Sequence, residues 1–135
     1  MSEQNIAGVS EQQVDTTQTH EVAQFLRRYQ VALVALEGDD AGQNILLTCM
    51  PFTIGRGKRA TMRINNETIS RRHARICLNA DNRLEVIDGG SVNGTFVNSE
   101  RIEAALLEDG DQLRFGSVRY QLLIEERGPM TYIPE

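Results

Sequence analysis

The sequence predicts an all-β fold, a β-sandwich of two antiparallel sheets. Short apolar runs recur every roughly 8–12 residues, and turn-forming residues separate them. No stretch keeps the apolar periodicity of a long helix. The chain has 135 residues, which is the length of one domain with tails.

We expect four segments along the chain. Residues 1–20 are polar and lack core-forming side chains, which is typical of a disordered tail rather than of a signal peptide. Residues 21–29 are predicted to form a short helix, because their apolar residues recur at three- and four-residue intervals. The predicted domain covers residues 30–125, and residues 126–135 form a C-terminal tail. Since no apolar run approaches the roughly 18 residues of a membrane span, we expect a cytoplasmic protein.

Each strand is predicted from an apolar run and the turn beside it. Gly116-Ser117 lies between two such runs and is typical of a β-hairpin turn. The predicted strands cover residues 31–36, 44–49, 52–55, 62–64, 74–78, 84–88, 95–97, 112–115 and 118–124.

Charge is unevenly distributed along the chain. The net charge is −5, but residues 52–75 contain seven basic residues and one acidic residue, which makes this stretch +6. A basic stretch in an acidic protein indicates a local anion-binding site. Nucleic acid is not favoured as the ligand, because interleaved aromatic side chains are lacking and the overall charge is negative.

The sequence shows no catalytic or metal-binding pattern. It lacks a Walker motif, a G-x-S-x-G elbow and an H-E-x-x-H motif. Its two histidines, His20 and His73, complete no credible set of metal ligands. Cys49 and Cys77 are interpreted as small core residues on strands. We therefore expect a protein that is not an enzyme and that uses no metal or cofactor.

Four polar or glycine-rich segments stand at predicted strand ends, where sandwiches build their binding sites. Arginine and serine are good phosphate donors, the first as a planar fork and the second as a compact hydroxyl. The segments are Gly55-Arg56, Ser70-Arg71-Arg72-His73, Asp88-Gly89-Gly90-Ser91 and Val92-Asn93-Gly94-Thr95. In this order and spacing they closely resemble the pattern of the forkhead-associated (FHA) family, over about residues 31–124.

The resemblance implies an FHA-type sandwich that binds phosphothreonine peptides. By position, Arg56 is implied to face the phosphopeptide, and the Ser70 hydroxyl is implied to donate to the phosphate. Arg71 adds a full positive charge, and Asn93 is implied to hold the peptide backbone. The phosphopeptide-binding set implied in this way is Arg56, Ser70, Arg71, Ser91, Val92 and Asn93. The residues implied to hold the loops in shape are Gly55, His73, Gly94 and Thr95.

Two positions depart from the family pattern. Val92 stands where the family frequently has threonine or another polar residue, so a side-chain contact is lost while a backbone contact is retained. Ser99 replaces the glycine of the final Asn-Gly pair, which is expected to reshape only the hairpin at residues 98–101. Neither change removes a phosphate ligand.

We expect the protein to act as a phosphothreonine-binding adaptor or regulator in a Ser/Thr kinase pathway. The expected partners are phosphothreonine-containing proteins and a Ser/Thr protein kinase, with no nucleic acid and no membrane. The alternative is a scaffold that binds its partner independently of phosphorylation, through the strands or the predicted helix. Retention of the complete phosphate-facing set favours the phosphate-dependent function.

The N-terminal tail contains candidate phosphorylation sites at Thr16, Thr17 and Thr19, after the acidic Asp15. This layout is similar to that of small actinobacterial FHA regulators of 2-oxoglutarate metabolism. In those regulators a phosphorylated threonine of the tail folds back into the protein's own site, so the resemblance implies a self-binding switch. Gln18-Thr19-His20 replaces the hydrophobic residues found there, and therefore a shared kinase and shared targets are not implied. A solubilising polar tail is the alternative interpretation.

Overall fold

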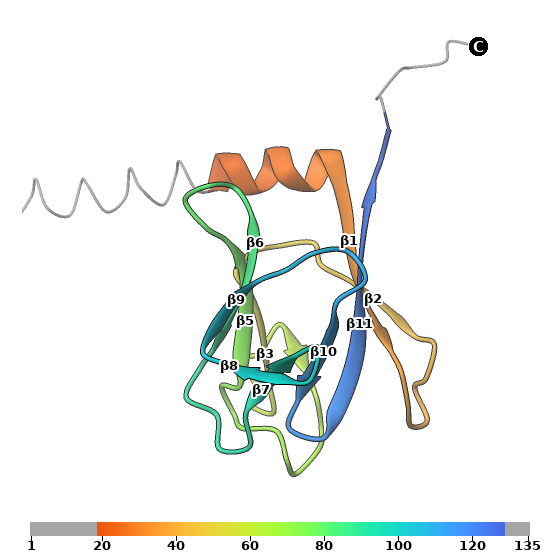
Figure 1. The fold of residues 1–135 in the computed structure, drawn as a ribbon, viewed down its shortest axis with the longest axis vertical. Helices are drawn as coiled ribbons and strands as arrows, with labels where there is room; N and C mark the ends of the chain where they lie inside the picture. Colours follow the sequence, from red (N-terminus) through yellow and green to blue (C-terminus); the bar gives the residue numbers. More distant parts are fainter. Residues whose placement is uncertain (1–18, 129–135) are drawn as a thin grey trace, which may run out of the picture.

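The computed structural model describes residues 19–128, which form a two-layer β-sandwich with one helix at its N-terminal end (Figure 1). The predicted sandwich is confirmed. In spatial order, the six-stranded sheet consists of β2 (Asn44–Leu46), β1 (Tyr29–Ala35), β11 (Val118–Glu126), β10 (Gln112–Phe115), β7 (Thr95–Val97) and β8 (Glu100–Ile102). The five-stranded sheet consists of β4 (Met62–Arg63), β3 (Phe52–Gly55), β5 (Ala74–Leu78), β6 (Leu84–Asp88) and β9 (Ala104–Leu106).

The core lies between the two sheets and follows from the two-residue periodicity of the strands. Leu113 and Phe115 on β10 have no exposed surface, and neither does Ile76 on the opposite sheet. Because side chains alternate between the faces of a strand, apolar residues two apart all point into this layer. Burial of these side chains from both sheets stabilises the sandwich through the hydrophobic effect.

Two strands that the sequence did not predict are β8 and β9. Both are three residues long and carry mainly exposed side chains, so they lack the apolar alternation that marks the other strands. β8 follows a two-residue turn in which Asn98 and Ser99 adopt φ angles of 51° and 75°. The left-handed backbone that the family's glycine allows is therefore adopted here by serine, and the predicted hairpin is retained.

One strand range, one cysteine and one strand pairing also differ from the predictions. The predicted strand over 44–49 ends at Leu46, and Cys49 is exposed in the following loop, so its prediction as a core residue is wrong. Residues 49–51 instead form a bend that leads into β3. Cys77 lies half-buried on β5, and burial raises the pKa of its thiol. Pairing is antiparallel in both sheets except between β3 and β4, which run parallel.

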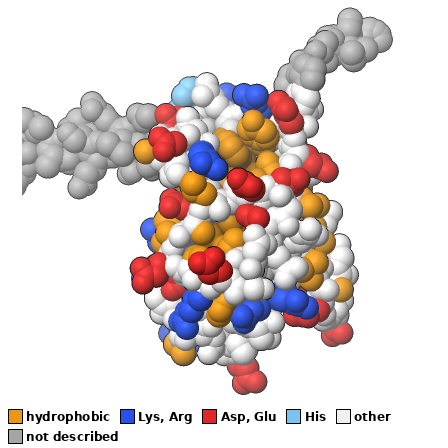
Figure 2. Space-filling view, viewed as in Figure 1, with side chains coloured by type: hydrophobic (Ala, Val, Ile, Leu, Met, Phe, Trp, Pro, Cys, Tyr) orange, Lys and Arg blue, Asp and Glu red, His pale blue; other side chains and the backbone are white. Residues whose placement is uncertain are grey.

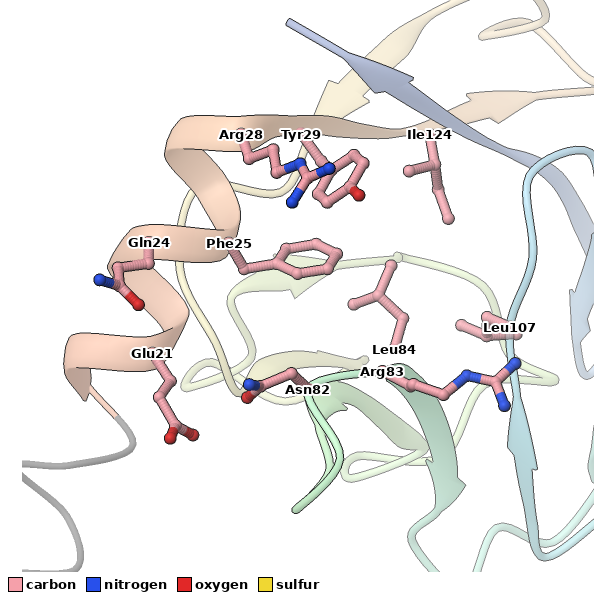
Figure 3. A pocket seen from close by; sticks show the side chains of 10 residues that line it. All are labelled: Glu21, Gln24, Phe25, Arg28, Tyr29, Asn82, Arg83, Leu84, Leu107 and Ile124. Carbon is pink, nitrogen blue, oxygen red and sulfur yellow. The ribbon is translucent and has the colours of Figure 1, made fainter.

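The helix is present and covers the described residues 19–28, against a predicted range of 21–29. Residues 19 and 20, which were assigned to the disordered tail, are helical, while residues 1–18 lie outside the described residues. Phe25 points from the helix toward the sandwich, with its ring centroid 4.8 Å from that of Tyr29 (Figure 3). The two rings border a cavity of about 390 Å³ between the helix and the sandwich.

The C-terminal end of the helix is fastened to the end of β11. Arg127 donates from Nε to the carbonyl of Leu26 at 2.9 Å, and its amide donates to the carbonyl of Arg28 at 2.8 Å. Arg28 in turn forms an ion pair with Glu126 at 3.3 Å. Cationic groups at a helix C-terminus satisfy its unpaired carbonyls and its dipole. The helix therefore lies at one end of β11, and the turn between β10 and β11 lies at the other end, about 26 Å away at 3.3 Å per residue.

Candidate functional site

The predicted site residues lie on three loops, which follow β3, β4 and β6, and hydrogen bonds join these loops. In the loop after β3, the Arg56 amide donates to the Ser70 carbonyl at 2.9 Å, and the Gly57 amide donates to the Arg71 carbonyl at 3.2 Å. In the loop after β6, the Val92 amide donates to the Ser70 hydroxyl oxygen at 3.0 Å. Residues from all three motifs are therefore neighbours in space.

These loops lie at the end of the sandwich opposite the helix. The Gly116 amide, in the β10–β11 turn, donates to the Gly94 carbonyl at 3.0 Å. The Ser117 amide donates to the Thr68 hydroxyl, also at 3.0 Å. The β10–β11 turn is thus bonded to the loop after β4 and to the loop after β6. A Cβ on Gly116 would approach the Thr68 carbonyl oxygen to 2.6 Å, so this close contact requires glycine.

Thr68 is a supporting residue that the sequence did not single out. Asn93 donates from its side-chain amide to the Thr68 carbonyl at 2.9 Å, which orients the Asn93 side chain. Asn66 in turn accepts hydrogen bonds from the amide and the hydroxyl of Thr68, at 2.8 and 2.6 Å. The Asn-x-Thr spacing was the available signal, since asparagine side chains commonly bond the backbone two residues on.

Gly55 allows the loop after β3 and the loop after β4 to approach each other. A Cβ at this position would overlap the carbonyl oxygen of Arg71. Only glycine leaves the backbone of residue 71 in place, which agrees with the structural role predicted for Gly55.

The Ser70 hydroxyl has one hydrogen bond within the described residues, and it accepts that bond. Its oxygen accepts from the Val92 amide, and no described group accepts its proton. Arg56 lies beside it, since its Nε donates to the carbonyl of Ile69 at 2.9 Å. The remaining nitrogens of Arg56 and the whole guanidinium of the exposed Arg71 make no hydrogen bond or ion pair within residues 19–128. These loops therefore carry several donors that are unused within the described residues.

His73 connects two of the loops from inside the protein. It has no exposed surface, and its Nδ1 accepts from the Ser70 amide at 3.0 Å. That bond requires Nε2 to carry the proton, so Nε2 donates to the Gly94 carbonyl at 2.8 Å. Its ring also contacts the edge of Phe115 in the core, with centroids 5.9 Å apart.

Asp88 holds the loop that contains Val92 and Asn93. Its carboxylate accepts from the amides of Gly90 and Ser91, at 2.9 and 3.0 Å, and from the hydroxyls of Ser91 and Thr95, at 2.6 and 2.7 Å. Burial alone raises the pKa of Asp88, but these hydrogen bonds outweigh burial and hold its pKa below the usual value. An aspartate ahead of Gly-Gly-Ser was the sequence signal for this role.

Ser91 differs from its predicted place among the phosphopeptide-binding residues. Its hydroxyl donates to Asp88 and accepts from the Gly94 amide at 3.0 Å, and the residue is 9% exposed. Both functions of the hydroxyl are used inside the loop, so we assign Ser91 to loop support. Val92 keeps its backbone contact to Ser70, while its side chain is 80% exposed.

The surface charge is not evenly spread over the sandwich. Figure 2 shows Lys and Arg side chains in a band across the lower part of one face, nearer the site than the helix, with Asp and Glu scattered over the rest. Within the described residues no group of three or more potential metal ligands occurs, and no helix is long and apolar enough to cross a membrane.

Comparison with known proteins supports the resemblance seen in the motifs. Residues 52–116 match the profile of the FHA domain. A solved FHA domain, studied for phosphothreonine-dependent interactions, is 31% identical, with a TM-score of 0.62 over 70% of this chain and 95% of that chain. The chain belongs to the FHA family.

Two curated relatives of this FHA protein are bacterial regulators. The oxoglutarate dehydrogenase inhibitor of Corynebacterium glutamicum is 37% identical over 91 residues, which are 67% of this chain and 63% of the relative. The glycogen accumulation regulator GarA of Mycobacterium tuberculosis is also 37% identical over 91 residues, which are 56% of its length. The match thus spans less than two thirds of either relative. The FHA-containing Mycobacterium tuberculosis EmbR, solved with a low-affinity phosphopeptide, is 26% identical over 76% of this chain and 26% of EmbR, with a TM-score of 0.64.

Replacing His73 by alanine is expected to destabilise the FHA domain by about 2–4 kcal/mol, because the Ser70 amide and the Gly94 carbonyl lose their buried partner. Urea unfolding followed by circular dichroism measures this loss. His20→Ala, an exposed change on the helix, is the control and is expected to change the free energy of unfolding by less than about 0.5 kcal/mol. A His73→Ala protein as stable as the control would contradict the bridging role.

Replacing Asp88 by asparagine is expected to lower the free energy of unfolding at neutral pH by about 2 kcal/mol. The amide nitrogen of asparagine is itself a donor and would face N–H and O–H groups that donate to the wild-type carboxylate. The pKa of Asp88 is lower in the folded than in the unfolded protein, so its carboxylate stabilises the folded state at pH values above the unfolded pKa of about 3.9. This stabilisation is lost as pH falls through the folded-state pKa.

The difference between wild type and Asp88→Asn should therefore shrink as pH falls below about 4. Urea unfolding at several pH values measures it, with the exposed Asp81→Asn as the control. A difference that stays constant down to pH values where the wild type begins to unfold would contradict the role of the Asp88 charge.

Proposed function

We propose that this FHA domain binds phosphothreonine peptides and acts as an adaptor or regulator in a Ser/Thr kinase pathway. The observation that carries the proposal is the Ser70 hydroxyl. Its oxygen accepts from the Val92 amide, and its proton has no acceptor among the described residues. Arg56 is bonded through Nε to the carbonyl of the preceding residue, Ile69, and keeps its other nitrogens unused. A phosphate dianion is the ligand that such a set of charged and neutral donors fits best.

Each predicted ligand residue has a distinct part in this proposal. Arg56 and Ser70 donate directly to the phosphate, and Arg71 adds a second positive charge from the same loop. Asn93 uses one amide proton on the Thr68 carbonyl, so its carbonyl oxygen is oriented and left to accept a backbone amide of the peptide. Val92 contributes through its backbone, which holds the Ser70 hydroxyl.

The remaining parts of the proposal have separate support. Threonine as the phosphorylated residue is supported by the phosphothreonine-dependent interactions studied with the similar FHA domain. A binding role without catalysis is supported by relatives that are named an inhibitor and a regulator. A cytoplasmic setting is supported by the two cysteines Cys49 and Cys77, which are both unpaired, as is usual in a reducing compartment.

Arg56→Ala and Ser70→Ala are each expected to lower phosphopeptide affinity at least tenfold, because each removes a charge-assisted hydrogen bond worth about 1.5–3 kcal/mol. The melting temperature should fall only modestly, because each substitution removes a single hydrogen bond within the described residues, Arg56 to Ile69 or Ser70 to Val92. A degenerate phosphothreonine-peptide library supplies the ligand, and fluorescence polarisation measures its affinity.

Arg27→Gln, which removes an exposed charge at the helix end, is the matched control and should bind as the wild type does. If no phosphothreonine peptide binds the wild type, or if dephosphorylated peptides bind equally well, the phosphate-independent scaffold becomes the better explanation.

We further propose that phosphorylation of the tail regulates the same site. The candidate residues Thr16 and Thr17 lie outside the described residues, but Thr17 is two residues before the described helix. With the helix docked, residue 19 lies at the helix end of the sandwich, and the site lies at the opposite end, about 26 Å away along β11. Binding of the tail to its own site therefore requires the helix to leave the sandwich. Thr19, the third candidate, belongs to that helix.

A chain carrying phosphothreonine at Thr16 or Thr17 is expected to bind the library peptide about tenfold more weakly than the unmodified chain, because a tethered ligand competes at high effective concentration. Phe25→Ala should strengthen this competition, since it loosens the helix. Fluorescence polarisation with the labelled peptide measures both effects, and Gln24→Ala is the exposed control on the helix. Equal affinity of modified and unmodified chains would remove the switch.

A further inference from the structure

The cavity of about 390 Å³ between the helix and the sandwich, which we call the helix cavity, has an apolar interior. Figure 3 shows the side chains of Phe25, Tyr29 and Ile124 turned toward the same space. Leu84 and Leu107, which are 3% and 4% exposed, belong to the core and form its base. An apolar space of roughly 150 Å³ already accepts a benzene ring, so the helix cavity has room for further apolar side chains.

The helix is fastened unevenly to the sandwich. Its C-terminal end is held by the hydrogen bonds of Arg127 and by the ion pair between Arg28 and Glu126. Among the described residues, no hydrogen bond or ion pair joins residues 20–25 to the sandwich. That part of the helix is held by Phe25, which packs against the core, and the helix cavity leaves this apolar contact incomplete.

The chain leaves the described residues at the rim of the helix cavity. Ile124 lines the cavity, and two residues later Glu126 pairs with Arg28, which lines it too. Gly128 follows with a φ angle of 79°, and a Cβ at this position would meet nothing within 4 Å. A left-handed residue of this kind turns the chain, and the space around it is open. The segment that follows Gly128 therefore starts beside the cavity.

Residues 129–135, which lie outside the described residues, contain apolar side chains suited to this cavity. The candidates are Met130, Tyr132 and Ile133. A tyrosine ring packs well against the aromatic rings of the lining, and methionine adapts to irregular spaces. At about 3.3 Å per residue, Ile133 can lie up to roughly 17 Å from Gly128. Attachment to the same chain also gives the segment a high effective concentration at the cavity.

We propose that residues 129–135 bind in the helix cavity of their own chain, with the side chains of Tyr132 and Ile133 against its apolar base. The bound segment holds the helix on the sandwich through apolar contacts, where hydrogen bonds do not. A partner protein is less favoured as the occupant, because it must compete with a segment that is attached at the rim. The cavity and the proposed phosphothreonine site lie at opposite ends of the sandwich, so this docking does not depend on phosphopeptide binding.

Nuclear Overhauser contacts in the full, unmodified chain test the docking directly. We expect contacts from the Tyr132 ring or the Ile133 methyl groups to the side chains of Leu84, Leu107 or Ile124. A mixture of isotope-labelled and unlabelled chains separates contacts within one chain from contacts between two chains. Absence of these contacts, or contacts formed only between two chains, would overturn the proposal.

The double variant Tyr132→Ser with Ile133→Ser is expected to raise the amide hydrogen-exchange rates of residues 20–28 about tenfold, because the helix then opens more often. The double variant Thr131→Ser with Glu135→Gln changes polar residues of the same segment and should leave these rates within about twofold of the wild type. Unchanged exchange in β5 and β6 establishes that the sandwich of both variants is folded. Equal helix exchange in the two double variants would contradict the proposal.

Docking of this segment also bears on the proposed tail switch, and this consequence rests on the proposed function. Self-binding of the tail requires the helix to leave the sandwich, so Tyr132→Ser with Ile133→Ser should strengthen the competition by a phosphorylated tail, by up to about tenfold. Fluorescence polarisation with the labelled peptide measures the difference. Competition of equal strength with and without the two substitutions would show that the segment does not restrain the helix. A phosphorylated tail that competes in neither case would count against the switch and leave the docking to the Overhauser contacts.

Discussion

The imidazole of His73 occupies a fully buried position between two loops, and each of its nitrogens bonds to one of them. A buried polar ring must satisfy both nitrogens, so its place determines how closely those loops approach. The spacing that results brings the Val92 amide within hydrogen-bonding distance of the Ser70 hydroxyl. The position of the Ser70 hydroxyl, the group proposed to donate to the phosphate, thus depends on a buried side chain that has no proposed contact with the phosphate.

Residues at this end of the sandwich fall into two groups by the use of their polar atoms. The supporting group, which includes Asp88, Ser91 and Thr95, has its side-chain donors and acceptors paired within the protein. The ligand-facing group keeps donors unused, and Arg56 shows how both needs are met: one nitrogen fixes the side chain to the Ile69 carbonyl and the others remain available. Such a site is organised before the ligand arrives, so little ordering is needed on binding.

The distribution of charge follows the same division along the length of the sandwich. At the helix end, Arg28 is paired with Glu126 and Arg127 holds helix carbonyls. At the site end, the basic residues of the 52–75 stretch lack carboxylate partners within the described residues. A protein with net charge −5 therefore presents a local positive field at one end of the sandwich, and such a field favours the proposed binding of phosphorylated peptides.

The sequence by itself determined the features that depend on short stretches of chain. Short apolar runs located nine strands, and apolar residues at three- and four-residue intervals located the helix. The motif order placed Arg56, Ser70 and Asn93 at strand ends or in loops. Only the tertiary structure decided that the Ser70 hydroxyl keeps its donor unused, that the Ser91 hydroxyl is bonded to Asp88, and that Cys49 lies outside the core. It also decided that Lys58 and Gly89 line one cavity. These outcomes depend on hydrogen bonds and packing between segments far apart in the chain, such as Thr68 with Asn93, and no local pattern of residues encodes such contacts.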